Sequence, residues 1–302
     1  MAQPKFSIGI DLGTSNSVLA FSPLSGEGGS EVLAIPQWDT PSTVTESATV
    51  PSFLYLPEEA IAAQIRGHGP GSGAWVVGRL AQRKASETPG RVVKSAKSWL
   101  CHHAADRSAP FLPWGSEELA SQDKISPVAA SANILAHLRA AWDARFSRQG
   151  PGFAFDAQDI TITVPASFDA AAQRLTLAAA EKAGFPGHVR LLEEPQAAFY
   201  SWLERQTDGD DPWSAPPDSR TAARHVLVID VGGGTSDFSL FELTRHADGC
   251  DAAIKRVAVS DHILLGGDNI DLAIAHMVEP RLATGGGGLS AGQWDHLVGL
   301  AA

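Results

Sequence analysis

Hydrophobic and polar residues follow one another along this chain in patterns that predict strands and helices. Residues 5–21 and 226–242 each contain an apolar run, an aspartate, a glycine-containing turn and a second apolar run. This order predicts a buried strand, a tight turn and an antiparallel return strand. Apolar and polar residues alternate in 159–165, which predicts a half-buried strand. Apolar residues spaced four apart in 128–147 predict a helix with one core-facing side.

Weaker patterns predict the other elements, and a few residues mark helix ends. Further strands are expected at 32–35, 49–56, 74–77, 189–192 and 253–261, and further helices at 78–83, 170–183, 196–206, from 270 onward and at 294–300. Asp169 is the expected N-cap of the helix that follows it, and Gly184 lies just beyond its end. Ser290 and Gln293 fit a capping box. Pro280 is expected to end or kink its helix.

Two charged stretches have an ordinary structural interpretation. Residues 91–100, RVVKSAKSWL, are basic in an acidic protein and fit a solvated helix face. Glu193 and Glu194 stand at a strand-to-helix junction. Acidic residues favour helix N-termini, so these two are expected to cap the helix.

The two glycine turns are related by an internal duplication. When Asp11 is aligned with Asp230, Gly13 falls on Gly232. Glycines let the backbone approach a ligand closely and direct several N–H groups at one point, which suits phosphate. An aspartate at the end of the strand suits Mg²⁺, bound directly or through its waters. One such turn alone could be an ordinary glycine hairpin. Two facing turns would hold a polyphosphate and its metal ion from both sides.

Composition narrows the class of protein. The chain has 302 residues, which suggests about two domains, and 44% hydrophobic residues, enough for real cores. A net charge of −11 argues against a nucleic-acid-binding protein with a broad basic surface. Cys101 and Cys250 are far apart in sequence and favour a reducing compartment. No signal peptide or membrane-spanning run is recognisable, so a soluble, cytoplasmic protein is expected.

The chain resembles the nucleotide-binding domain of the seventy-kilodalton heat-shock chaperones, the DnaK type. The resemblance rests on five segments in order, IGIDLGTSNS, ITVPASFD, LLEEPQAAFYSW, VIDVGGGTSDFSLFE and LLGGDNID. It implies an α/β, actin-like (ribonuclease H-like) two-lobe fold, with mixed sheets flanked by helices and a nucleotide cleft between the lobes. The lobes would be 1–207 and a partial second lobe at 224–302. The acidic, proline-rich residues 208–223 would form a linker or insertion.

The resemblance also implies site residues. Asp11 and Asp230 would hold hydrated Mg²⁺. Lys97 would orient the attacking water, and Glu194 and Asp237 would help to position that water or the metal, so that Lys97, Glu194, Asp230 and Asp237 form the catalytic set. The nucleotide would be contacted by Gly13, Thr14, Ser15, Asn16, Gly232, Gly233, Gly234, Thr235, Gly266 and Gly267. Phosphoryl transfer needs in-line placement and charge neutralisation more than covalent chemistry, and this set can supply both.

The implied activity is ATP hydrolysis with ATP/ADP and Mg²⁺ in a molecular chaperone. Unfolded polypeptides, a J-domain co-chaperone and a nucleotide-exchange factor would be partners of the full-length protein, and neither nucleic acid nor a membrane is expected. The glycine turns alone would also fit an actin-like scaffold protein, or a sugar kinase or exopolyphosphatase of the same fold. The segments EEPQAA and LGGDNID favour the chaperones.

Departures from the family pattern suggest a divergent bacterial member. Residues 167–170 read SFDA where the family has YFND, Gln173 stands where an arginine is usual, and Asn269 replaces an acid. The second lobe is shorter than the family's and lacks its later glycine motif. A C-terminally truncated chain is therefore expected, with weak or no nucleotide binding of its own.

Overall fold

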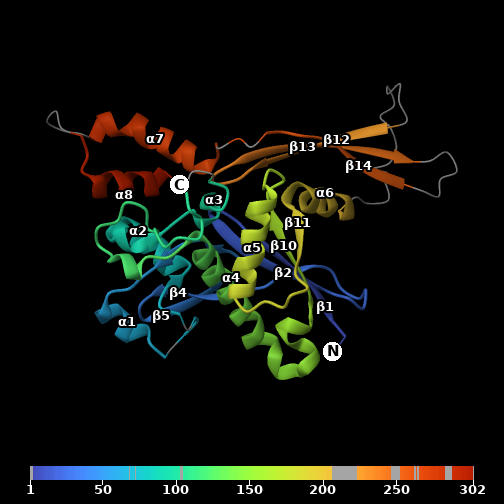
Figure 1. Ribbon diagram of the computed structural model, residues 1–302, viewed down its shortest axis with the longest axis horizontal. Helices are drawn as coiled ribbons and strands as arrows, with labels where there is room; N and C mark the ends of the chain where they lie inside the picture. Colours follow the sequence, from blue (N-terminus) through green and yellow to red (C-terminus); the bar gives the residue numbers. More distant parts are fainter. Residues whose placement is uncertain are drawn as a thin grey trace.

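The computed structural model describes residues 3–67, 69–71, 73–102, 105–205, 223–245, 252–261, 263, 265–282 and 288–301 (Figure 1). The strands are β1 Phe6–Leu12, β2 Asn16–Pro23, β3 Glu31–Val32, β4 Ile35–Thr40, β5 Thr43–Ser47, β6 Val50–Pro51, β7 Leu54–Tyr55, β8 Val76–Val77, β9 Val92–Val93, β10 Asp159–Val164, β11 Arg190–Glu193, β12 Ala223–Val231, β13 Ser236–Arg245 and β14 Ala252–Val259. The helices are α1 Glu59–Ile65, α2 Arg79–Glu87, α3 Ala96–Trp99, α4 Pro127–Phe146, α5 Ala170–Lys182, α6 Glu194–Glu204, α7 Gly267–Leu282 and α8 Ala291–Ala301.

The first predicted hairpin is the centre of a six-stranded mixed sheet. β1 and β2 pair antiparallel, with Leu12 opposite Ser17. The other edge of β1 pairs in parallel with β10, and β10 pairs in parallel with β11, so the order is β11-β10-β1-β2-β3, with β6 added to β2. Side chains alternate across a strand, so one face of β1 buries Ile8 and Ile10 in the main core. The predicted apolar stripe of α4 is buried in the same core, including Trp142.

The second predicted hairpin forms a separate three-stranded sheet. β12 pairs antiparallel with β13, with Val231 opposite Ser236, and β14 pairs with the other edge of β13. Helix α6 packs against this sheet, where Phe199 stacks on Phe241 with ring centroids 4.7 Å apart. Figure 1 shows the sheet extending over α6 and leading back to α7 and α8. We call residues 3–205 the N-terminal part and residues 223–301 the C-terminal part.

Three of the expected helix boundaries have the expected chemistry. The Asp169 carboxylate accepts a hydrogen bond from the Ala172 N–H at 2.6 Å and caps α5. Gly184 follows that helix with a φ of 80°, in the left-handed region that favours glycine. Ser290 and Gln293 form the reciprocal bonds of a capping box, at 3.0 and 3.4 Å. Because the box places Ser290 at the N-cap, α8 begins at residue 291, earlier than predicted.

Other local predictions are wrong, because long-range contacts decide those segments. The expected strand 49–56 is two strands in different sheets, β6 beside β2 and β7 between β8 and β9. The break falls at Ser52, whose N–H bonds to the Ser15 carbonyl oxygen. The expected strand 32–35 is also divided, between the end of β3 and the start of β4.

The two charged stretches also differ from their structural interpretation. Residues 91–100 form β9 and the four-residue helix α3, and Lys97 is only 7% exposed. Glu193 precedes α6 but makes no capping hydrogen bond, and α6 begins at Glu194 rather than at residue 196. Both carboxylates form ion pairs instead.

Pro280 lies inside α7, which continues to Leu282. Residues 206–222, nearly all of the predicted linker, and Cys250 lie outside the described residues.

The buried His137 on α4 predicts an acid-sensitive fold. Burial lowers the pKa of His137 from 6.5 to about 4, partly offset by a backbone hydrogen bond at Pro36. Between those values the unfolded chain binds a proton that the folded chain excludes, so the free energy of unfolding decreases as the pH falls, by about 3 kcal/mol in total. Above pH 6.5 the group is neutral in both states and contributes nothing to this slope.

Urea unfolding of the wild type and the His137→Gln variant between about pH 7 and pH 4.5 measures this contribution. We expect a shallower decrease in the variant. Carboxylates with raised pKa, such as Glu194 and Asp230, act in the opposite direction, but they are common to both proteins and cancel in the comparison. The matched control is His276→Gln, because the His276 side chain is 68% exposed. Equal pH slopes for the wild type and His137→Gln would contradict the prediction.

Candidate functional site

The two glycine turns lie against each other. A Cβ atom placed on Gly233 would lie 1.9 Å from the Ser15 Oγ atom and 3.2 Å from the Ser15 Cβ atom, so a side chain there would displace Ser15. A Cβ atom on Gly234 would lie 2.9 Å from the Ser98 Oγ atom and 3.4 Å from the Thr14 Cγ2 atom. The duplicated turns, which are far apart in sequence, therefore meet face to face.

The first turn is tightly packed against its own backbone and is held by Ser52. A Cβ atom on Gly13 would lie 2.1 Å from the Asn16 carbonyl oxygen, which excludes any side chain there. The Ser52 hydroxyl donates to the Gly13 carbonyl oxygen at 2.8 Å, and the Ser52 N–H donates to the Ser15 carbonyl oxygen at 2.8 Å. Ser52 was not predicted from the sequence, where its only local signal is the Pro-Ser pair at 51–52.

The second turn is supported from behind by the glycine segment 265–268. The Gly232 N–H donates to the Thr235 carbonyl oxygen at 2.8 Å and closes the turn. The Gly267 N–H then donates to the Gly232 carbonyl oxygen at 2.9 Å. A Cβ atom on Gly266 would lie 2.5 Å from the carbonyl oxygens of both Gly232 and Gly233. Gly266 and Gly267 therefore contact the back of the turn.

A cavity of about 520 Å³ lies beside the meeting turns. Of the residues predicted to form the site, it is lined by Asp11, Gly13, Thr14, Ser15, Asn16, Lys97, Glu194, Asp230, Gly232, Gly233 and Thr235. Gly234, Asp237, Gly266 and Gly267 are not among the described residues that line it. Asp237 stands directly opposite Asp230 in the hairpin and is 3% exposed. Thr163 and Phe168 also line the cavity and were not predicted.

Lys97 and Glu194 form an ion pair in the wall of this cavity. Helix α3 carries the lysine and the first residue of α6 is the glutamate, so the pair joins two separate elements of the N-terminal part. The Lys97 Nζ atom also lies 6.0 Å from the centre of the Phe168 ring. Burial raises the pKa of Glu194, the Lys97 ammonium opposes this, and the nearby Asp11 and Asp230 carboxylates raise it further.

Negative charge is in excess around the cavity. Asp11, Glu194 and Asp230 line it, whereas Lys97 is the one lysine or arginine among its described lining residues. Burial raises the pKa of Asp230, and the carboxylates of Asp237 and Asp11 raise it further. A bound cation would relieve this repulsion, so the residues fit Mg²⁺. Among the described residues, no group of three or more His, Cys, Asp or Glu side chains is placed to hold a metal ion together.

The fold and the paired glycine turns define the class of the protein, which is that of proteins with the actin-like ATPase fold. A family model described as "Hsp70 protein" matches residues 72–284, and the chain belongs to this family. It is 32% identical over 289 residues to the "Chaperone protein HscA homolog" of Actinobacillus pleuropneumoniae serotype 5b (strain L20), an alignment that covers 91% of this chain and 38% of the relative.

Two other relatives show the same relationship. The HscA homolog of Bordetella pertussis is 32% identical over 282 residues, covering 90% of this chain and 37% of that protein. The homolog of Azotobacter vinelandii is 31% identical over 314 residues, covering 99% of this chain and 41% of that protein. The chain therefore spans about two fifths of the length of the curated relatives it matches. In the part of the chain that the structure describes, no helix has both the length and the apolar character to cross a bilayer.

Proposed function

We propose that this chain is the ATP-binding and ATP-hydrolysing part of an Hsp70-type chaperone. The observation that carries the proposal is the meeting of two duplicated glycine turns beside one cavity, with aspartates from both hairpins and the Lys97–Glu194 pair in its wall. Membership of the Hsp70 family supports it. In this proposal the lobes are residues 1–207 and 224–302, joined through 208–223.

The residues of the site would have different roles in binding Mg²⁺, the phosphates and the attacking water. Asp11 and Asp230 would hold a hydrated Mg²⁺ ion, which supplies charge neutralisation for the phosphates when bound. Thr14, Ser15 and Asn16 would contact phosphate from the first turn, and Gly232, Gly233, Gly234 and Thr235 from the second. Lys97, paired with Glu194, would orient the attacking water. Glu194, and Asp237, which stands opposite Asp230 in the hairpin, would help to position that water or the metal. Gly266 and Gly267 would act through the second turn, which they support.

The longer protein's role follows only as a further proposal. A DnaK-type chaperone would bind unfolded polypeptides, a J-domain co-chaperone and a nucleotide-exchange factor. These partners and the cytoplasmic location stay predictions.

We expect ATP binding to depend strongly on Mg²⁺. Three carboxylates against one ammonium repel a metal-free triphosphate, so chelation of Mg²⁺ should weaken ATP binding about tenfold or more. Calorimetric titration of ATP and ADP into the full chain, with Mg²⁺ or with a chelator, measures this. In the Asp230→Asn variant, most of the difference in ATP affinity between Mg²⁺ and chelator should disappear, because the substitution removes one of the repelling charges and one metal ligand.

The control is Glu59→Gln, since the Glu59 side chain is 81% exposed on α1 and should leave the titration unchanged. No ATP binding under either condition would contradict the proposed function for this chain and would agree with the weak or absent nucleotide binding expected from its sequence. ATP-dependent sedimentation of large assemblies would instead favour an actin-like scaffold protein.

A further inference from the structure

Ser95 has a backbone conformation that residues with a Cβ atom rarely adopt. Its φ and ψ are 54° and 35°, and among the described residues it is the one non-glycine residue with a positive φ. This left-handed conformation is disfavoured for a serine unless the surroundings hold it. Ser95 directly precedes α3, which carries Lys97. The strained residue is therefore two positions from the cation that the proposed reaction needs.

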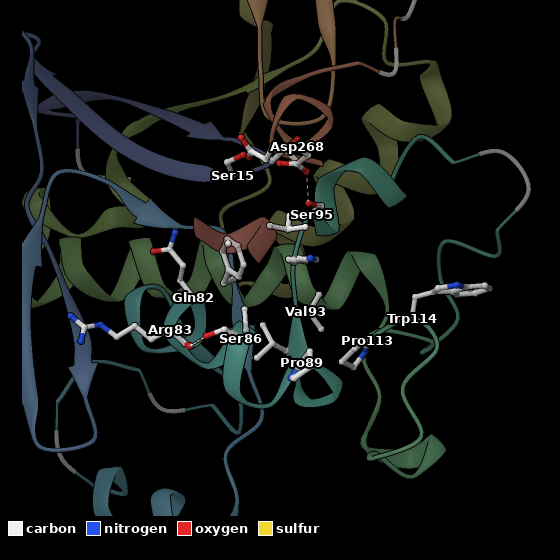
Figure 2. A pocket seen from close by; sticks show the side chains of 18 of the residues that line it. Ser15, Gln82, Arg83, Ser86, Pro89, Val93, Ser95, Pro113, Trp114 and Asp268 are labelled. Carbon is white, nitrogen blue, oxygen red and sulfur yellow. Dashed lines mark hydrogen bonds between the residues drawn. The ribbon is translucent and has the colours of Figure 1, made fainter. Parts of the chain in front are cut away.

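A hydrogen bond from the C-terminal part holds Ser95. Its hydroxyl donates to the Asp268 Oδ2 atom at 3.1 Å, and Figure 2 shows this bond between the two side chains. Asp268 lies in the first turn of α7, and its backbone N–H donates to the Gly233 carbonyl oxygen at 2.7 Å. Asp268 therefore touches the second glycine turn with its backbone and the segment before Lys97 with its side chain.

The segment 95–98 contacts the C-terminal part at both of its ends. Ser95 bonds to Asp268, and Ser98 lies so close to Gly234 that a Cβ atom there would come within 2.9 Å of its hydroxyl oxygen. Lys97 stands between these contacts and is paired with Glu194. A displacement of the second turn would thus be transmitted to the α3 segment at two points.

The bond also lies beside the candidate site. Ser95 and Asp268 line a second cavity, of about 760 Å³, and Thr14 and Ser15 line both this cavity and the first one. Burial raises the pKa of Asp268, and the Ser95 hydroxyl opposes this by donating to the carboxylate. The hydroxyl therefore stabilises the ionised carboxylate at a partly buried position.

We propose that Ser95 and Asp268 are positioning residues for Lys97, because their hydrogen bond couples the second glycine turn to the α3 segment and holds the lysine toward the cavity. The role in hydrolysis rests on the proposed function, whereas the placement of Lys97 does not. Neither residue touches the first cavity, so both act through Lys97 and the turn.

The first test measures the placement of Lys97 without nucleotide. The rate of acetylation of each lysine of the full chain is followed by mass spectrometry, with the exposed Lys255 as the internal reference. We expect acetylation of Lys97 to be about threefold faster or more in Ser95→Ala and Asp268→Ala, because local opening becomes more frequent. Asp268→Asn should show a smaller rise, since its amide oxygen can still accept the hydroxyl proton.

The Ser95→Gly variant separates the hydrogen bond from the backbone strain. Glycine adopts a positive φ freely but has no hydroxyl group. If the hydrogen bond places Lys97, acetylation rises in Ser95→Gly as in Ser95→Ala. Wild-type acetylation in Ser95→Gly, or in all four variants, would overturn the proposal. The conservative Asp268→Asn and Ser95→Gly variants keep the test decisive if an alanine variant does not fold.

The second test is kinetic. In Ser95→Ala we expect kcat for ATP hydrolysis to fall about tenfold with little change in KM. A mispositioned Lys97 would stabilise the transition state less well but would change the binding of the ground state little. The control is Ser86→Ala. Ser86 lines the same second cavity, but its hydroxyl donates to the Arg83 carbonyl oxygen within α2. A wild-type chain without ATPase activity would refute the proposed function, while the acetylation rates would still decide the positioning role. Unchanged kcat in an active enzyme would overturn that role.

Discussion

Replacing Lys97 with alanine is expected to reduce kcat for ATP hydrolysis by about a hundredfold or more, because loss of one preorganised charge at a reacting centre typically costs that much. The residue is buried in the cavity wall and is the one lysine or arginine among the described lining residues, so no neighbouring cation there can replace it. Steady-state hydrolysis with saturating Mg²⁺-ATP measures the effect. A rate equal to that of the wild type would show that the assignment of Lys97 is wrong.

The same substitution is also expected to destabilise the fold. It leaves Glu194 buried without its partner, and breaking a buried ion pair from one side costs about 3 kcal/mol. Because the pKa of Glu194 is already raised, the folded chain takes up a proton more readily than the unfolded chain. The loss should therefore be largest near neutral pH and should diminish as the pH falls through the raised pKa.

A double variant separates the two effects. Lys97→Ala combined with Glu194→Gln removes the unpaired charge, so it should recover most of the unfolding free energy and none of the activity. Lys84→Ala is the control, since Lys84 pairs with Glu87 on α2, away from the first cavity. Recovery of activity in the double variant would show that Lys97→Ala acted only through the stability of the fold.

The second large effect is expected on stability and ATP binding when Gly266 is replaced, and the adjacent Gly267 provides the control. Gly266→Ala is expected to lower the free energy of unfolding by about 2–3 kcal/mol. Its Cβ atom would lie 2.5 Å from two backbone carbonyl oxygens of the second turn, which cannot move aside as a flexible side chain can. The turn itself must shift, so ATP binding should be lost as well.

Gly267→Ala should change stability by about 0.5 kcal/mol or less. The nearest atom to its Cβ would be the Gly233 Cα atom at 3.7 Å, an ordinary van der Waals contact. Denaturant unfolding and ATP titration of both variants compare the two glycines directly. Similar losses in both would contradict the close packing of Gly266 against the second turn.

The sequence was sufficient for the features that depend on neighbouring residues. The aspartate and glycines between apolar runs predicted both hairpins, and the four-residue spacing in 128–147 predicted α4, because strand and helix periodicity are local properties. Asp169, Ser290 and Gln293 were recognised as caps for the same reason. The duplication also indicated that Asp11 and Asp230 belong to one site, and they line one cavity.

Only the tertiary structure decided which distant residues support that site. Ser52 and Asp268 reach the glycine turns from segments whose local patterns predict only a strand and a helix start. Residues 91–100 read as a solvated basic helix, yet Lys97 is buried, because Glu194, nearly a hundred residues away, supplies the opposite charge that makes burial possible. Such contacts depend on where the chain returns in space, and a local pattern of residue types carries no information about that.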